Sequence, residues 1–204
     1  GIYDIYIHAR SEGQYGVNYK DDNKRSSYIN IDNDYINEYP GIGNDWKTEG
    51  LPAMQVTVAH EFFHAIQRWY TSDGTNGTYD SYFWEFTSTW IEDIIYPDSN
   101  DYLYFIENFD LEENYDLTTI NSNLPGNDGY KFALYGHYLS SIVEGVANEM
   151  NSTIMLSVWE NIEIGALQSL KNVLSDYNVT FSTTWIDFIS RNLYNGVFQD
   201  VDND

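Results

Sequence analysis

Apolar residues recur at helical spacing in the stretch from Pro52 to Tyr70. A spacing of three or four positions marks one face of an amphipathic helix, and the positions here are Met54, Val58, Phe62, Ala65, Ile66 and Trp69. Pro52 suits the first turn of a helix, and the pattern ends before Ser72. A second helix is predicted from Ser81 to Tyr96, where Pro97 stops it, and a short third one from Tyr102 to Phe109.

The N-terminal 35 residues show a different pattern. Residues 2–7 mix β-branched and aromatic side chains, and residues 27–32 alternate polar with apolar, which is typical of strands. Gly13, Gly16 and the polar stretch 20–26 indicate turns between them. We therefore expect two or three strands of a small antiparallel sheet.

The C-terminal part is predicted to be mainly helical. After a turn cluster at residues 125–129, four helices are expected, at about 132–149, 152–161, 165–176 and 182–194. The pattern predicts an α+β protein, and no Pro/Gly/Ser-rich linker divides it. We interpret residues 1–204 as one catalytic domain with a cleft, comprising an N-terminal subdomain of about residues 1–96 and a helical C-terminal subdomain of about residues 97–204.

Composition narrows the classes of partner. The net charge of −23 disfavours nucleic acid and anionic membranes, and no apolar run approaches the ~18 residues of a membrane span. The chain has no cysteine, which excludes disulfides and a thiolate zinc site. An acidic surface fits solubility outside the cell or adaptation to high salt. We expect a secreted, extracellular protein and a monomer. Because the chain starts like an internal segment, we also expect it to be trimmed from a longer precursor.

Residues 60–64 form an H-E-x-x-H pattern inside the first long helix. Four residues turn a helix by about 400°, so His60 and His64 project from nearly one face and can bind one zinc ion. Glu61 points about 100° away and is placed to take a proton from a zinc-bound water. The alternative is a packed histidine pair, but burying two imidazoles beside a glutamate is costly without a metal or hydrogen bonds.

The third metal ligand must come from another part of the chain, because no histidine occurs within the next few residues. Glu85 is the leading candidate, since it lies in an apolar, aromatic stretch of the second helix. The alternative is an ion pair of Glu85 with Arg68 or Lys131. A second group of polar residues on this helix could accept a hydrogen bond from an imidazole, although solvent exposure is the favoured interpretation for them: Ser88, Thr89, Glu92 and Asp93.

These motifs resemble the gluzincin clan of zinc metallopeptidases, of which thermolysin is the familiar member. They are similar in particular to an uncharacterised group of bacterial and archaeal metalloproteases, in residues 28–35, 55–67 (QVTVAHEFFHAIQ) and 84–102 (beginning WEFTSTWIED). The resemblance covers most of residues 1–160. It implies a zincin-like fold, with His60, His64 and Glu85 as metal ligands and Glu61 as the catalytic glutamate. Trp84 replaces the asparagine that usually precedes the gluzincin glutamate.

A peptidase of this kind needs a donor for the oxyanion formed when water attacks a carbonyl. Tyrosine or histidine downstream supplies it in similar enzymes. His137 is the first candidate, with Tyr135 and Tyr138 behind it. The alternative is that His137 is a partly buried polar residue with a structural role, which is also the interpretation of His8.

The expected reaction is zinc-dependent hydrolysis of a peptide or protein substrate lying along the sheet, with residues 27–33 as the candidate edge. Two alternatives remain: a zinc hydrolase of a non-peptide substrate, and a non-catalytic surface or binding protein stabilised by metal. Calcium could bind the acidic clusters at 32–34, 98–101 and 200–204. None has EF-hand spacing, and solvated loops explain them better.

Overall fold

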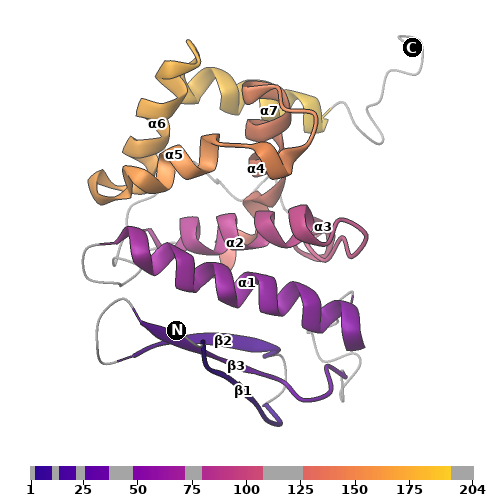
Figure 1. Ribbon diagram of the computed structural model, residues 1–204. Helices are drawn as coiled ribbons and strands as arrows, with labels where there is room; N and C mark the ends of the chain where they lie inside the picture. Colours follow the sequence, from indigo (N-terminus) through magenta and orange to yellow (C-terminus); the bar gives the residue numbers. More distant parts are fainter. Residues whose placement is uncertain are drawn as a thin grey trace, which may run out of the picture. The chain divides into compact units, whose positions relative to one another are not determined.

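The computed structural model describes residues 3–10, 14–21, 26–36, 48–71, 80–107 and 126–193. Within these ranges the protein is α+β and mostly helical (Figure 1). The chain forms two compact units, Gly1–Gly136 and His137–Asp204. The boundary between the units thus lies at residues 136–137, whereas the sequence suggested a division near residue 96.

The first unit contains a three-stranded sheet with the order β1-β3-β2. The strands are β1 (Ile5–Ile7), β2 (Gly16–Lys20) and β3 (Ser27–Ile31). β2 is antiparallel to β3, but β1 runs parallel to it, so the expectation of a wholly antiparallel sheet is wrong. The chain reverses direction on each side of β2, and two reversals leave β1 and β3 pointing the same way.

β2 occupies a segment whose sequence indicated turns. Gly16, Asn18 and Lys20 are poor strand formers, and the strand exists because it pairs with β3 along its whole length. At one end of this pairing Gly16 lies opposite Ile31, and at the other end Lys20 lies opposite Ser27. Tertiary pairing has therefore overridden local propensity here.

Two long helices cover one face of the sheet. α1 (Gly50–Tyr70) packs against β2 and β3, and α2 (Ser81–Ile95) packs against α1 on the side away from the sheet (Figure 1). Ile29 and Ile31 of β3 form a small core with Ala53 of α1 and with Tyr35. Both helices match their predicted ranges closely. The short α3 (Leu103–Glu107) comes next, and a 3-10 helix, η1 (Gly126–Phe132), packs along α2.

Between residues 132 and 149, where one helix was predicted, the chain is broken into shorter elements. α4 (Ala133–Tyr138) continues into a π-helical turn, η2 (Leu139–Glu144), and a 3-10 turn, η3 (Glu149–Asn151), lies beyond it. The helix ends at Gly145 because this residue adopts a left-handed conformation with φ of 77°.

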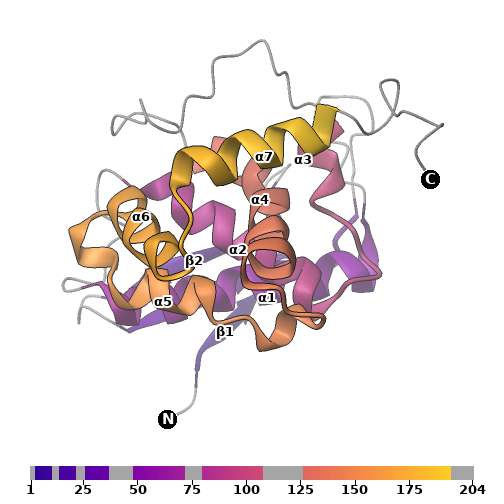
Figure 2. The same cartoon turned by 90° about the horizontal axis from the view of Figure 1, so that it is seen from above.

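The remaining helices of the second unit confirm the prediction. They are α5 (Ile154–Glu160), α6 (Ala166–Asp176) and α7 (Phe181–Leu193), with a 3-10 turn, η4 (Ile162–Ile164), between the first two. α5 packs against α6, and α6 contacts α7 (Figure 2). Among the described residues, no helix combines the length and apolar character needed to cross a membrane.

Candidate metal centre

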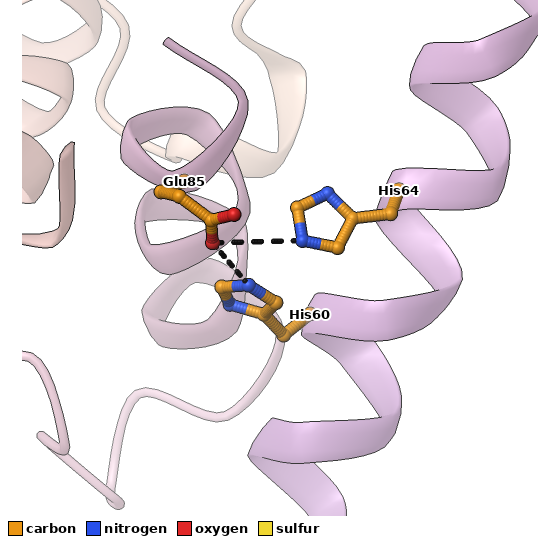
Figure 3. A group of neighbouring side chains, drawn as sticks. All are labelled: His60, His64 and Glu85. Carbon is orange, nitrogen blue, oxygen red and sulfur yellow. Dashed lines mark hydrogen bonds and ion pairs between the residues drawn. The ribbon is translucent and has the colours of Figure 1, made fainter. Parts of the chain in front are cut away.

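Two helices bring three potential metal ligands together. His60 and His64 lie one turn apart on α1, and Glu85 faces them from α2 (Figure 3). The Oε2 atom of Glu85 lies 3.0 Å from His60 Nε2 and 3.6 Å from His64 Nε2. All three ligand atoms lie within 4.8 Å of one another. The structure thus brings together the three residues that the sequence selected.

The donor set fits a divalent metal ion. Two imidazoles and one carboxylate suit zinc and several other first-row metals, and both histidines are buried, with 6% and 8% of their surface exposed. Among the described residues, these three form the one group of His, Cys, Asp or Glu side chains that could hold a metal. Glu85 therefore has the two histidines as partners rather than the suggested Arg68, whose Nε donates to Asn18 Oδ1 at 2.8 Å.

His60 and Glu85 strongly shift the pKa values of one another. Burial raises the pKa of Glu85, but hydrogen bonds from His60 and His64 outweigh it and hold that pKa well below its usual range. Burial lowers the pKa of His60, yet Glu85 and Glu92 together raise it well above its ordinary value. The raised pKa favours a protonated His60 beside Glu85, and burial raises the pKa of the second partner, Glu92, to about 7. A metal ion has to displace the proton of His60 in order to bind.

The Nδ1 atoms of both imidazoles make hydrogen bonds with side chains other than Glu85. His60 Nδ1 hydrogen-bonds Glu92 Oε1, and His64 Nδ1 lies 2.6 Å from Gln67 Oε1 and 3.3 Å from Ser88 Oγ. Glu92 and Ser88, two of the residues suggested as imidazole partners, thus do contact the imidazoles. Solvent exposure, the favoured interpretation for these residues, is wrong for Glu92, Ser88 and Thr89, which are 6%, 0% and 0% exposed. Thr89 instead donates to the main-chain oxygen of Glu85.

Gln67 was missed by the sequence analysis. Its side chain is fully buried, and its Nε2 lies 2.9 Å from Trp84 O and 3.0 Å from Thr87 Oγ1 of α2. Gln67 is three residues after His64 and so lies on the same helical face. That spacing is the signal that would have found it. Orienting partners of this kind fix the tautomer and direction of a metal-binding histidine.

Glu61 lines a cleft of about 690 Å³ together with the three candidate ligands. The cleft is lined by β2, by the His60–Arg68 stretch of α1, by Glu85 and Glu92 of α2, and by Tyr104 and Tyr130. The Glu61 residue is 8% exposed, and its Oε1 lies close to Gly16 of β2. A carboxylate beside a metal centre and open to a cleft is placed to exchange protons with bound water.

Tyr130 is a second residue that the sequence analysis missed. Its ring stacks on His60 at 5.6 Å between centroids and on Phe105 at 4.6 Å, and its hydroxyl hydrogen-bonds Glu85. Burial and the neighbouring Glu85 raise the pKa of Tyr130 well above its ordinary value, so the hydroxyl stays protonated. Tyr130 lies between the turn cluster 125–129 and the predicted helix, so it belongs to no periodic pattern that would have indicated a role.

The sequence candidates for an oxyanion donor have partners other than the three candidate ligands. Tyr135 is 1% exposed, packs on Phe86 at 6.5 Å and is not among the described residues that line the cleft. His137 belongs to the second unit, and its Nδ1 lies 3.0 Å from Glu149 Oε2. A catalytic role for Tyr135 or His137 stays a prediction. Tyr138 donates to Asp187 at 2.8 Å.

Two of the three acidic clusters have structural partners. Asp32 accepts main-chain hydrogen bonds from Arg10 at 2.9 Å and Tyr35 at 2.8 Å, and so fixes the turn after β3. Asp101 accepts from Thr48 Oγ1 at 2.8 Å. Residues 200–204 lie outside the described residues. Calcium binding stays a prediction at these clusters.

His8 Nδ1 lies 3.0 Å from the main-chain oxygen of Ala9.

Compared with protein-family models, curated proteins and solved structures, the chain matches none.

Proposed function

We propose that this protein is a zinc-dependent peptidase of the gluzincin type. The observation that carries the proposal is the convergence of His60 Nε2 and His64 Nε2 on one carboxylate oxygen of Glu85. With these three ligands, a fourth position would stay open toward the cleft, which is the arrangement of catalytic rather than structural zinc. The H-E-x-x-H spacing, with Glu61 beside the cleft, supports hydrolysis.

A zinc ion held there would polarise a carbonyl group and acidify bound water. Glu61 supplies the base: its carboxylate accepts the proton of the attacking water and then delivers it to the leaving amine. Tyr130 supplies a hydroxyl that stays protonated and lies beside Glu85. We assign it as the donor to the oxyanion in preference to His137 and Tyr135, because it lines the same cleft as Glu61.

The substrate is an extended peptide paired with the sheet. The sequence analysis expected the peptide to pair with residues 27–33. That expectation is wrong, because β3 is the central strand of the sheet. β2 is an edge strand and lines the cleft. Asp32 N donates to Tyr15 O and Asp21 N donates to Ser26 O, so the alternating residues Gly16 and Asn18 direct their main-chain groups away from β3. Arg68 Nη2 donates to Asn18 O at 3.5 Å, a bond that a pairing peptide would replace. A peptide would add to this edge as a further strand.

Metal analysis with activity measurements tests the proposal. Purified protein is expected to bind one zinc ion per chain and to cleave a peptide library, and chelation should abolish cleavage until zinc is restored. Glu61→Gln should keep the metal and lose about 10²- to 10⁴-fold in kcat. Glu49→Gln is the matched control, because this exposed carboxylate precedes α1 outside the cleft.

Other outcomes point to the two alternatives. Zinc binding with hydrolysis of esters but of no peptide would identify a non-peptide hydrolase. A protein that binds zinc without any hydrolysis, or whose activity survives Glu61→Gln, would be a metal-stabilised binding protein. Absence of metal binding would remove all three functions at once.

A further inference from the structure

Strand β2 approaches α1 so closely that one of its residues has no room for a side chain. A Cβ atom built on Gly16 would lie 2.4 Å from Thr57 Cγ2 and 2.9 Å from Glu61 Cγ. Ordinary contacts of such atoms are about 3.5–4.0 Å. The main chain of the strand therefore lies directly on the side chain of Glu61, and glycine is the residue that permits this approach.

Asn18 holds the strand in this position. Its side chain is 9% exposed, and its Nδ2 donates to the main-chain oxygen of Glu61 at 3.1 Å. Its Oδ1 accepts from Arg68 Nε at 2.8 Å. These bonds join β2 to α1 both at the Glu61 turn and two turns further on. The contact at Gly16 is thus fixed from the neighbouring position and is not free to open.

We propose that Gly16 is a positioning residue for Glu61. By letting the edge strand lie against the Glu61 side chain, it limits the directions that the carboxylate can take. This inference rests on the proposed function, in which Glu61 is the base and β2 is the edge that receives the peptide. One strand then sets both the place of the substrate and the place of the base, so the two keep a constant spacing.

The two close contacts of a Gly16 side chain can be separated experimentally. Thr57→Ser removes the methyl group 2.4 Å from the built Cβ and keeps the hydroxyl group of the side chain. The contact with Glu61 Cγ remains in that background. Gly16→Ala in the wild-type and Thr57→Ser backgrounds therefore distinguishes general packing from the position of Glu61.

The experiment compares four zinc-loaded full-length proteins: wild type, Gly16→Ala, Thr57→Ser and the double variant. Gly16→Ala should lower both the Tm and kcat. The double variant should regain part of the Tm lost in Gly16→Ala, while its kcat stays about 10²-fold below that of Thr57→Ser, because a shift of about 1 Å at a catalytic group costs this much. KM and zinc affinity should change little, since the metal ligands lie on α1 and α2 and the added methyl group points away from the substrate edge.

Crystal structures of Thr57→Ser and the double variant give a readout that does not depend on turnover. The Glu61 carboxylate should be displaced in the double variant, with His60 and His64 in place. A double variant with the kcat of Thr57→Ser, or with Glu61 unmoved, would overturn the role of Gly16. If wild type hydrolyses no peptide, the proposed function fails, and the two structures still decide whether Gly16 fixes Glu61.

Discussion

Each of the two compact units pairs a largely buried histidine with a glutamate, and the surroundings of the two pairs differ. In the first unit, His60 lies between Glu85 and Glu92, and the oxygen of Glu85 that it meets also faces His64. In the second unit, Glu149 is the carboxylate partner of His137 and also accepts from Ser140 Oγ. One carboxylate thus receives two imidazoles, and the other receives an imidazole and a hydroxyl.

This difference separates a candidate metal centre from a structural ion pair. Hydrogen bonds from Ser140 and His137 satisfy Glu149, which lies at the start of the 3-10 turn η3, so the pair stabilises local backbone. Glu85 instead completes a triangle of ligand atoms supplied by two helices. Convergence of three donors, rather than the presence of a histidine–glutamate pair, is the feature that supports metal binding.

Removing one glutamate from each unit tests this comparison most strongly. Glu85→Ala should weaken zinc binding by about 10²- to 10³-fold, because one ligand of a four-donor zinc site is worth roughly 3–4 kcal/mol. Glu149→Ala should leave zinc affinity unchanged and lower the Tm. Competition with a chromogenic chelator measures both affinities. Equal losses of zinc affinity in the two variants would remove the distinction between the two pairs.

Two tyrosines give the next largest contrast. Tyr130→Phe should lower kcat by about 10²-fold with zinc content unchanged, because it removes one donor to a developing oxyanion. Tyr138→Phe is its matched control in the second unit, where the hydroxyl bonds Asp187. This variant should lose stability rather than turnover. Steady-state kinetics on one peptide substrate and thermal unfolding separate the two effects, and a full loss of activity in Tyr138→Phe alone would reverse the assignment.

The sequence predicted the two long helices of the first unit well, and the structure brings its three candidate ligands together. His60 and His64 share a face by their spacing alone, and Glu85 is conspicuous as a carboxylate in an aromatic helix. The alternation within residues 27–32 likewise marked β3. These features depend on residues near one another in the chain.

The features that the sequence did not predict depend on tertiary contacts. β2 forms although Gly16 and Asn18 disfavour a strand, because β3 provides its hydrogen-bond partners. Tyr130 reaches His60 through the packing of η1 along α2. The sequence of the second helix alone suggested that Glu92 is solvent-exposed, whereas the contact of α2 with α1 buries it. In each case the determining partner is distant in sequence, so no local pattern records it.

Glu92 gives a smaller and more specific effect on the metal centre. Glu92→Gln keeps an oxygen that can accept from His60 Nδ1 but removes the charge, so zinc affinity should fall by about 10- to 100-fold. Asp93→Asn removes the same charge from the next residue of α2 and is the control. Chelator competition at one ionic strength compares the two. Identical affinities would show that α2 acts through its total charge rather than through this hydrogen bond.

The smallest expected effect concerns a glutamate that stabilises a helix in the second unit. Glu144 accepts main-chain hydrogen bonds from Thr153 at 2.9 Å and Ile154 at 3.2 Å at the beginning of α5. Burial raises the pKa of Glu144, but the hydrogen bonds from Ser152, Thr153 and Ile154 outweigh it and lower that pKa below the ordinary 4.5. Glu144→Gln should therefore cost about 1 kcal/mol of stability at neutral pH, as loss of a helix cap does.

The sign of the pH dependence is set by this lowered pKa. Because the folded state binds the proton more weakly than the unfolded state, the contribution of Glu144 is complete above pH about 4.5 and is lost as the pH falls through the folded pKa. Urea unfolding at a series of pH values should show wild type and Glu144→Gln converging in acid. Glu160→Gln, exposed at the other end of α5, should show no such loss, because a negative charge there opposes the helix dipole. A constant difference between wild type and Glu144→Gln across the whole pH range would mean that the shape of the side chain, and not its charge, holds the start of α5.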